Sequence, residues 1–438
     1  MNKSGGANSP LISTTSGGVE AQTTAQRNLY PRLPAFKRAE GCWLFDAQGH
    51  AYFDGTAGSG ALNLGHNHPQ VIEAAITQTR RIVHTGSILH SDARDHFVSR
   101  LGAFAPFDPC AVLLTVTGTE AVEAALKVAR AHTGRRAVVA FSYAYHGKSS
   151  GGLSVTWREA YKRYSPLAPD TVWVAPYPLL HADHDQSATA ACLAECKSVI
   201  ERMTAAGHPP AAVILEPIAS SEGILPAGQA FLEGVQALAK EAQALVIFDE
   251  LWTAMGRCGT PFYGGRPGLH PDMILVGKSV ANGFPVSAVL GAPTVLDALP
   301  SGLHTATFAG HPVGCAAGTA VLDIMEQTQP WHAAIEKGST LKSMLNTFAG
   351  GSTFIAGLRG EGLLLAFDCM DAKGQPSAEI AHAFALQAQE KHLLLAYGGW
   401  QGNTIKLTPP LTMKASDLEF FIDTVAEVIE DTHWELSR

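Results

Sequence analysis

Short apolar runs alternate with amphipathic segments through the middle of the chain, between residues 111 and 291. Each run is apolar at almost every position, whereas stretches such as 119–134 and 229–243 repeat apolar residues at the spacing of an α-helix. Strands of that kind, separated by helices, are typical of a mostly parallel sheet covered on both faces. The pattern therefore predicts an α/β fold whose strands include Ala111–Thr115, Ala137–Phe141, Thr171–Ala175, Ala211–Glu216, Ala244–Glu250, Met273–Lys278 and Ser287–Gly291.

The pattern differs towards both ends of the chain. Residues 43–54 form two short strand-like runs around Gly49, which predicts a β-hairpin. After residue 325, helical stretches are mixed with strand-like runs, which predicts a smaller α+β domain. We therefore expect a disordered leader at 1–26, an N-terminal segment at 27–80 that packs with the small domain, a large domain at 81–325 and a C-terminal small domain at 326–438.

Composition narrows the function classes. The net charge of −8, without any cluster of Lys and Arg, argues against a nucleic-acid-binding protein. No run approaches the roughly 18 apolar residues of a membrane helix, and the first residues lack the apolar stretch of a secretory signal. The seven cysteines are scattered, without a C-x-x-C pair, which predicts reduced thiols in a cytoplasmic protein.

Two charged residues stand at the ends of predicted buried strands. Asp249 ends one such run and Lys278 ends the next one along the chain. In open α/β sheets this edge faces the ligand crevice. A pyridoxal-phosphate (PLP) site needs both residue types: a carboxylate to keep the pyridine nitrogen protonated, and a desolvated lysine to act as nucleophile and proton carrier.

A phosphate site is predicted directly after the first of these strands. Thr117 and Glu120 match a capping box, so a helix should begin here. Gly118 and Thr119 would then lie in its first turn, where free N–H groups and the helix dipole favour an anion. An ordinary capped helix would have the same local sequence.

An aromatic and a histidine follow the second strand. Tyr145 could stack on a flat heteroaromatic ring, and His146 could help to shape that wall of the site. A purely structural aromatic would fit the local sequence as well.

An ordered set of motifs runs from near the start of the chain to near its end. The motifs are GALNLGHNHP, TGTEAVEAALKVAR, YHG, EPI, DELWTAMGRCG, GK followed by ANGFP, TFAGHPVGCAA and LTPPLT. Together they resemble class-III aminotransferases over roughly residues 30 to 435, and the N-terminal third is most similar to diaminobutyrate-type enzymes. The resemblance implies a fold-type-I PLP-dependent transferase with a mostly parallel seven-stranded sheet, and a homodimer with its active sites at the interface.

Site residues follow from this resemblance, position by position. It implies that Lys278 is the Schiff-base lysine, that Asp249 is the pyridinium partner, and that Thr307 reaches the phosphate of the neighbouring subunit. It also implies cofactor-binding roles for Gly118, Thr119, Tyr145, Glu216 and Leu251, while His146 is a cofactor-binding candidate from its place beside Tyr145.

The substrate positions depart from the family pattern. Lys406 stands where relatives acting on ω-amino acids commonly have an arginine, and lysine cannot make a bidentate fork to a carboxylate. Ser221 stands where they carry a gating glutamate, unless a one-residue slip gives that role to Glu222. Ser59 falls in the substrate pocket, and Trp252 replaces a usual glutamine.

The resemblance implies a ping-pong aminotransferase that moves an amino group from an ω-amino acid, diamino acid or amine to an oxo acid or aldehyde. An aminomutase of the glutamate-semialdehyde type is the alternative. Residues 147–151 also match the G-x-S-x-G pattern of serine hydrolases around Ser149, but the following GGLSVTW does not look helical, as that pattern requires. HADHD at 181–185 has no partner motif, so we expect no metal site.

Overall fold

The computed structural model describes residues 33–163, 171–179, 186–349 and 354–436. The leader predicted at 1–26 and the histidine-rich segment at 181–185 lie outside them. Residues 36–438 form one compact unit, which holds all the helices and strands discussed below. None of the helices within the described ranges combines the length and the apolar character needed to cross a membrane.

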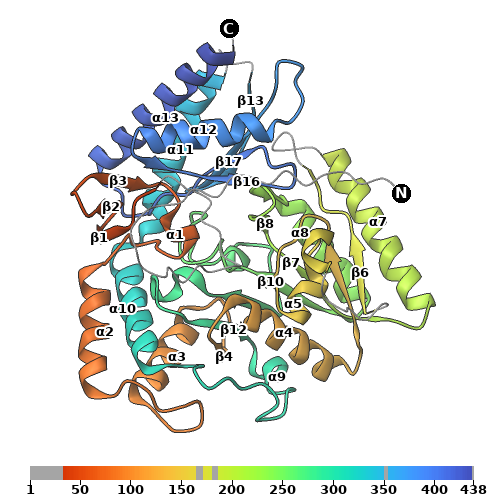
Figure 1. Cartoon of the computed structure of the whole chain (residues 1–438). Helices are drawn as coiled ribbons and strands as arrows, with labels where there is room; N and C mark the ends of the chain where they lie inside the picture. Colours follow the sequence, from red (N-terminus) through yellow and green to blue (C-terminus); the bar gives the residue numbers. More distant parts are fainter. Residues whose placement is uncertain (1–32, 164–170, 180–185, 350–353, 437–438) are drawn as a thin grey trace, which may run out of the picture. The chain divides into compact units, whose positions relative to one another are not determined.

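A seven-stranded sheet forms the centre of this unit (Figure 1). Its order is β4-β12-β11-β10-β7-β5-β6. Strand β12 is antiparallel to both of its neighbours, β4 and β11, and all the other pairs are parallel. The predicted mostly parallel seven-stranded sheet is therefore confirmed. The strands are β4 (Ala111–Thr115), β5 (Ala137–Phe141), β6 (Val172–Ala175), β7 (Pro210–Leu215), β10 (Leu245–Asp249), β11 (Met273–Val276) and β12 (Ser287–Gly291).

Helices cover both faces of this sheet because alternate strand residues point to opposite sides. Val138 and Ala212 belong to the core under α4 (Gly118–Thr133), whereas their neighbours Val139 and Val213 pack on the other side. That second side is covered by α3 (Asp92–Phe104), α7 (Gln186–Ala205), α8 (Gln229–Glu241) and α10 (Pro312–Thr328). Helix α2 (Pro69–Arg81) packs on α10.

Two smaller sheets share a second hydrophobic core. The N-terminal hairpin pairs in parallel with β15, through Phe53 opposite Leu393, so both ends of the sequence meet in one sheet. That sheet contains β1 (Phe36–Glu40), β2 (Trp43–Asp46), β3 (Ala51–Asp54) and β15 (Leu393–Leu394). The other contains β13 (Ile355–Glu361), β14 (Leu364–Cys369), β16 (Ala396–Gly398) and β17 (Thr404–Leu407), flanked by α11 (Pro330–Ala349), α12 (Ala378–Glu390) and α13 (Ala415–Leu436).

The remaining elements are short. They are α1 (Ala57–Gly60), α5 (Ser150–Val155), α6 (Glu159–Lys162), α9 (Pro293–Leu296), the hairpin of β8 (Ile218–Ala219) and β9 (Leu225–Pro226), and the 3₁₀ turns η1 (Tyr263–Gly265) and η2 (Lys278–Ala281).

Helix α5 corrects one expectation, because residues after Ser149 were predicted not to be helical. The carboxylate of Glu123, on α4, accepts hydrogen bonds from the Gly151 N–H at 2.6 Å and from the Ser149 hydroxyl at 2.7 Å. A partner 28 residues away in sequence thus satisfies the first turn of this helix. The local sequence contains no sign of that contact.

Candidate active site

Asp249 and Lys278 leave the same edge of the central sheet. Asp249 is the last residue of β10, and Lys278 follows β11 after Gly277. The two strands are parallel neighbours, with Asp249 paired to Leu275. Lys278 has a left-handed backbone, with φ of 46°. This conformation is strained for a residue with a β-carbon, and such strain concentrates at functional sites.

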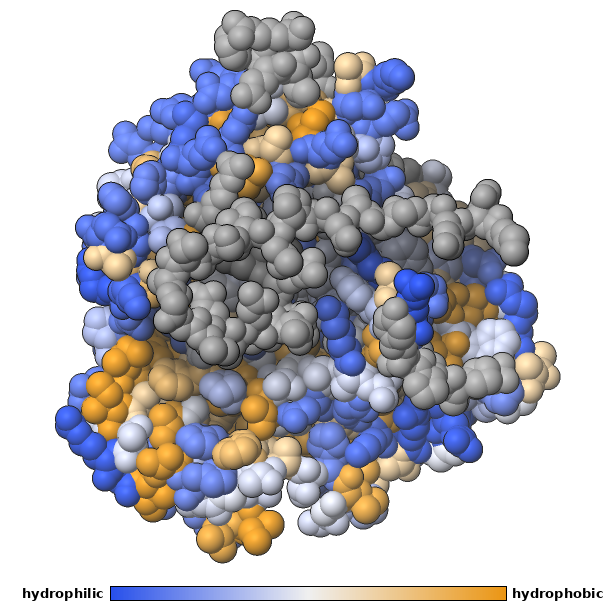
Figure 2. Space-filling model, viewed as in Figure 1, coloured by the Kyte–Doolittle hydropathy of each residue, from blue (hydrophilic) through white to orange (hydrophobic). Residues whose placement is uncertain are grey.

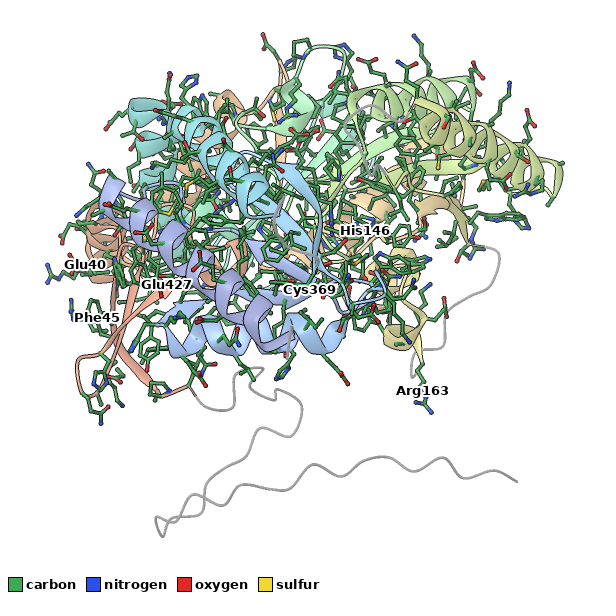
Figure 3. The ribbon with its side chains drawn as sticks, turned by 90° about the horizontal axis from the view of Figure 1, so that it is seen from above. Glu40, Phe45, His146, Arg163, Cys369 and Glu427 are labelled. Atoms are coloured by element: carbon green, nitrogen blue, oxygen red, sulfur yellow. The ribbon has the colours of Figure 1, made fainter. Side chains whose placement is uncertain are left out.

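The Asp249 carboxylate is buried and held at both oxygens. His146 Nδ1 lies 2.7 Å from Oδ2, and the Leu251 N–H donates to Oδ1 at 3.1 Å. His146 Nε2 is buried without a hydrogen-bond partner among the described residues. The carboxylate therefore favours the tautomer in which Nδ1 carries the proton and donates it. His146 is itself buried, and Figure 3 labels its position within the ribbon.

Lys278 lies in an environment that favours its neutral amine. Burial lowers the pKa of Lys278, while the carboxylates of Asp249 and Glu216 oppose that shift. Its Nζ lies 4.5 Å from the centre of the Trp252 ring. A lowered pKa leaves more of the amine unprotonated and able to attack a carbonyl carbon.

Glu216 lies between Tyr145 and the acidic end of β10. Its two oxygens accept the N–H groups of Tyr145 and Ser220, each at 3.0 Å. Burial, followed by the charge of Asp249, raises the pKa of Glu216. The structure therefore brings Glu216, Tyr145, Asp249 and Lys278 to one place.

The predicted capping box is present at the start of α4. The Thr117 side chain accepts the Glu120 N–H, and the Glu120 carboxylate accepts the Thr117 N–H at 3.1 Å. A β-carbon added to Gly118 would lie 2.6 Å from Leu251 Cδ1, so the Leu251 side chain covers the helix N-terminus. These features fit a phosphate at the helix end beside a ring flanked by Leu251.

Thr119 and Ser149 add hydroxyl groups beside this helix end. Their side-chain oxygens lie 2.6 Å apart. A β-carbon on Gly147 would lie 2.3 Å from Thr119 Oγ1, so only a glycine fits there. The contacts of Ser149 argue against a hydrolase nucleophile. The Ser149 hydroxyl forms hydrogen bonds with Thr119 and Glu123. The nearby His146 does not contact this hydroxyl, because its Nδ1 lies against Asp249.

Two predicted site residues stand apart from this cluster. Thr307 is exposed on the segment before α10, and no described contact joins it to Asp249 or Lys278. Ser59 is also exposed, on α1, with φ of 61°. The neighbouring Gly60 packs on Trp252, since a β-carbon there would lie 2.2 Å from the indole nitrogen.

The substrate positions show a rearrangement that the motifs did not predict. The Lys406 amine donates to the carbonyl of Ser221 at 2.7 Å. Glu222 forms an ion pair with Arg158, which sequence reasoning missed. Arg158 lies in the short segment between α5 and α6 and belongs to none of the sequence motifs. Trp252, which replaces a usual glutamine of the family, was not predicted to be a site residue. The centre of its ring lies 4.5 Å from the Lys278 amine and 5.6 Å from the Lys406 amine.

Glu250, next to Asp249, should make the free energy of unfolding depend on pH. Its fully buried carboxylate accepts the N–H groups of Tyr263 at 2.6 Å and Gly264 at 2.7 Å. Burial raises the pKa of Glu250 to about 7. In the unfolded chain the pKa is about 4.3, so the folded chain binds more protons between these pH values. This group therefore makes the free energy of unfolding fall as pH rises through that window, by at most about 4 kcal/mol.

We expect denaturant unfolding of the cofactor-free protein to show this loss between pH 5 and 8. The Gln side chain of Glu250→Gln cannot titrate. The free energy of unfolding of this variant should therefore rise relative to that of the wild type as pH rises, even if the variant is less stable than the wild type at pH 5. Glu241→Gln, at an exposed site, serves as the control with an unchanged slope. Parallel pH profiles for wild type and Glu250→Gln would contradict the assignment.

Comparisons with known proteins agree on one family. The sequence pattern described as aminotransferase class-III matches residues 24–429. The chain is 32% identical over 404 residues to 5-aminovalerate aminotransferase DavT of Pseudomonas aeruginosa, covering 90% of this chain and 93% of that protein. It is also 32% identical over 425 residues to a diaminobutyrate--2-oxoglutarate aminotransferase of Rhizobium meliloti, covering 92% and 89%.

A solved structure gives the same likeness. It is an (S)-enantioselective omega-transaminase from Thermomicrobium roseum, with a TM-score of 0.86, 26% identity, and coverage of 94% of this chain and 97% of that one.

Proposed function

The chain belongs to the class-III aminotransferase family, so it is a PLP-dependent transaminase of ω-amino acids or amines, and we propose that Lys278 and Asp249 carry its chemistry. The observation that supports this most is their position at the ends of neighbouring parallel strands, with a buried carboxylate and an amine of lowered pKa. The relatives named for 5-aminovalerate and diaminobutyrate support an ω-amino donor.

PLP, when bound, supplies an aldehyde for the amino group and a ring that accepts electrons from the reacting carbon. Lys278 would hold the cofactor covalently between turnovers and then move the proton at the reacting carbon. Asp249 would hold the proton on the ring nitrogen. His146 would keep that carboxylate oriented through its hydrogen bond at 2.7 Å.

The other residues would position the ring and its phosphate. The N–H groups at Gly118 and Thr119 would bind the phosphate at the start of α4. Leu251 would cover one face of the ring and Tyr145 the other. Glu216 would lie near the ring oxygen, and Ser59, Ser221 and Lys406 would face the substrate.

The requirement for two substrates tests this function. We expect purified holoenzyme to form product from 5-aminovalerate, 2,4-diaminobutyrate or a primary amine only when an oxo acid or aldehyde is also supplied. The reason is that the amino group stays on the enzyme until an acceptor removes it. Liquid chromatography with mass detection would follow both products. Turnover of a single amino aldehyde without an acceptor would instead indicate an aminomutase.

We also propose a homodimer in the cytoplasm. All seven cysteines are free thiols, which supports a reducing compartment. Seven exposed large hydrophobic residues gather on α2, on the segment after it and on the loop before α10, and Figure 2 shows such a patch over α2 and its surroundings. An exposed apolar patch of this kind is typical of a protein interface. The seven are Ile76, Ile82, Val83, Ile88, Leu89, Leu303 and Phe308.

The loop before α10 belongs to this patch and also borders a pocket. A pocket of about 580 Å³ lies between the segments around Arg94 and His304, and the Phe308 ring lies 5.0 Å from His84. Thr307 directly precedes Phe308. A dimer formed through this patch would cover the exposed Thr307. This position fits the role that the family resemblance implies, and we propose that Thr307 reaches the partner's cofactor across the interface.

A charge in the patch should separate the subunits. Ile88 is the most exposed of these residues, with an exposed fraction of 86%. The substitution Ile88→Glu would place an unpaired charge in the interface. We expect the dimer to weaken by at least about 30-fold, as for an interface hot spot, and PLP affinity to fall with it. Sedimentation velocity would measure the strength of the dimer, and PLP titration would measure the affinity for the cofactor. Ile335→Glu, exposed on α11 outside the patch, is the control, and a wild-type monomer with full activity would contradict the proposal.

A further inference from the structure

The side chain of Trp252 lies directly beside the proposed reacting amine. Trp252 belongs to the turn after β10, three positions beyond Asp249, where the family usually has a glutamine. The Lys278 Nζ lies over its ring, 4.5 Å from the ring centre. An ammonium within about 6 Å of the centre of an indole is attracted by the negative face of the ring. The geometry is therefore that of a cation–π contact at the amine.

The backbone of α1 fixes the position of this ring. A β-carbon on Gly60 would lie 2.2 Å from the indole nitrogen, so the nitrogen edge of Trp252 packs against this glycine. Gly60 has φ of 80°, a conformation that favours glycine. The indole nitrogen is buried without a hydrogen-bond partner among the described residues. A buried unpaired donor costs free energy, so hydrogen bonding does not explain why the indole lies here, whereas the contact of its face with the amine does.

Opposing effects act on the charge of Lys278. Burial lowers the pKa of Lys278, and the carboxylates of Asp249, at the end of β10, and Glu216, after β7, oppose that shift. Helix α10 also packs on the turn that begins at Lys278, but its acidic residues pair with Arg100 on α3. The two carboxylates and the Trp252 ring are therefore the neighbours that favour the charged amine.

A second amine faces the same ring. The Nζ of Lys406, on β17, lies 5.6 Å from the centre of the Trp252 ring and donates to the carbonyl of Ser221 at 2.7 Å. Burial lowers the pKa of Lys406 to about 8, and the charge of Lys278 acts in the same direction. Two cations near one another repel, and a shared electron-rich ring face reduces the cost of that repulsion.

An aromatic face suits a residue that carries a proton. Such a residue must keep its proton until the proton is delivered to the reacting carbon. Burial works against this at Lys278, because it favours the neutral amine. The face of Trp252 attracts the ammonium but cannot take its proton, whereas a carboxylate in the same place could.

Resting on the proposed role of Lys278, we propose that the face of Trp252 stabilises the charged form of the Lys278 amine whenever that amine is not bonded to the cofactor. Trp252 is thus a positioning residue, which acts through the lysine and transfers nothing itself. It keeps the proton on the amine, and the amine beside the reacting carbon, until the proton is delivered.

Competitive acetylation of the cofactor-free protein tests this, because acetic anhydride reacts only with a neutral amine. Peptide mass mapping between about pH 6 and 11 gives the midpoint of the Lys278 titration, and Lys197, exposed on α7, is the internal reference. The midpoint, unlike the rate, does not depend on how easily the reagent reaches the amine. We expect Trp252→Leu to lower the midpoint by about one pH unit and Trp252→Phe to leave it within about 0.3 unit.

The direction of the shift separates the ring contact from simple burial. Leucine is apolar but smaller than an indole, so a role in burial alone would admit water and raise the midpoint. Trp400→Leu removes a partly exposed indole that packs on Tyr143, and it should leave the midpoint unchanged.

A second substitution keeps the test decisive if Trp252→Leu does not fold. Trp252→Met also removes the ring, with an unbranched side chain, and should lower the midpoint in the same way. An unchanged or raised midpoint in the Leu or Met variant, or an equal fall in Trp252→Phe, would overturn the inference.

The outcome is separable from that of the proposed function, because acetylation needs neither cofactor nor turnover. A protein that transfers amino groups while its Lys278 midpoint ignores Trp252 would remove this inference alone. A protein that transfers no amino group would remove the proposed function, whatever the acetylation gives.

Discussion

Lys278→Ala should lower kcat for transamination by about 10⁴-fold, the upper range for loss of a positioned acid–base group. The variant loses the amine that we propose binds the cofactor and moves the proton. The strained backbone at Lys278, with φ of 46°, and its lowered pKa fit a residue used in this way. Steady-state kinetics with an ω-amino acid and an oxo acid would measure the effect.

The same variant should still bind PLP, because the proposed phosphate site at the start of α4 and the carboxylate of Asp249 remain. Dialysis followed by PLP quantification would show retention without covalent attachment. Lys197→Ala, at an exposed position on α7, is the matched control with normal kcat. Turnover of Lys278→Ala within 10-fold of the wild type, a limit that corresponds to about 1.4 kcal/mol, would show that another residue does the chemistry.

Asp249→Asn should lower kcat by about 10²- to 10³-fold, the effect of removing one preorganised electrostatic partner. The amide cannot supply the negative charge that keeps a ring nitrogen protonated. It also loses the charge-assisted contact with His146 at 2.7 Å. Because Asn has the same shape, the fold should persist.

The comparison for this variant is Asp297→Asn, which changes an exposed carboxylate. Stopped-flow measurement of one amino-transfer step would isolate the chemistry from product release. A near-normal rate in Asp249→Asn would mean that the ring nitrogen is held by a different group.

Residues whose placement depends on local sequence were predicted well. The apolar runs around Asp249 and Lys278 identified two neighbouring strands, and strand ends on a parallel sheet lie at one edge. The capping box at Thr117 and Glu120 needs only four consecutive residues and was confirmed. The order of motifs then identified the family.

Residues whose placement depends on distant contacts were not predicted. The Arg158 ion pair joins residues 64 positions apart, and its bond to Gly399 spans 241 positions. Helix α5 depends on Glu123 in the same way. Arg158 and Glu123 carry no local pattern, because their partners are set by tertiary packing. Arg158 contacts the loop between β16 and β17, and Glu123 contacts the start of α5 through the packing of α4 on α5. Thr307 remains a prediction, since its proposed partner lies in a second subunit.

Covalent attachment of PLP to Lys278 can be detected by reducing the PLP-loaded wild-type protein with borohydride and mapping its peptides. We expect one modified peptide, with the added pyridoxyl-phosphate mass on Lys278. Modification of Lys406 or another lysine, with Lys278 unmodified, would show that Lys278 does not carry the cofactor.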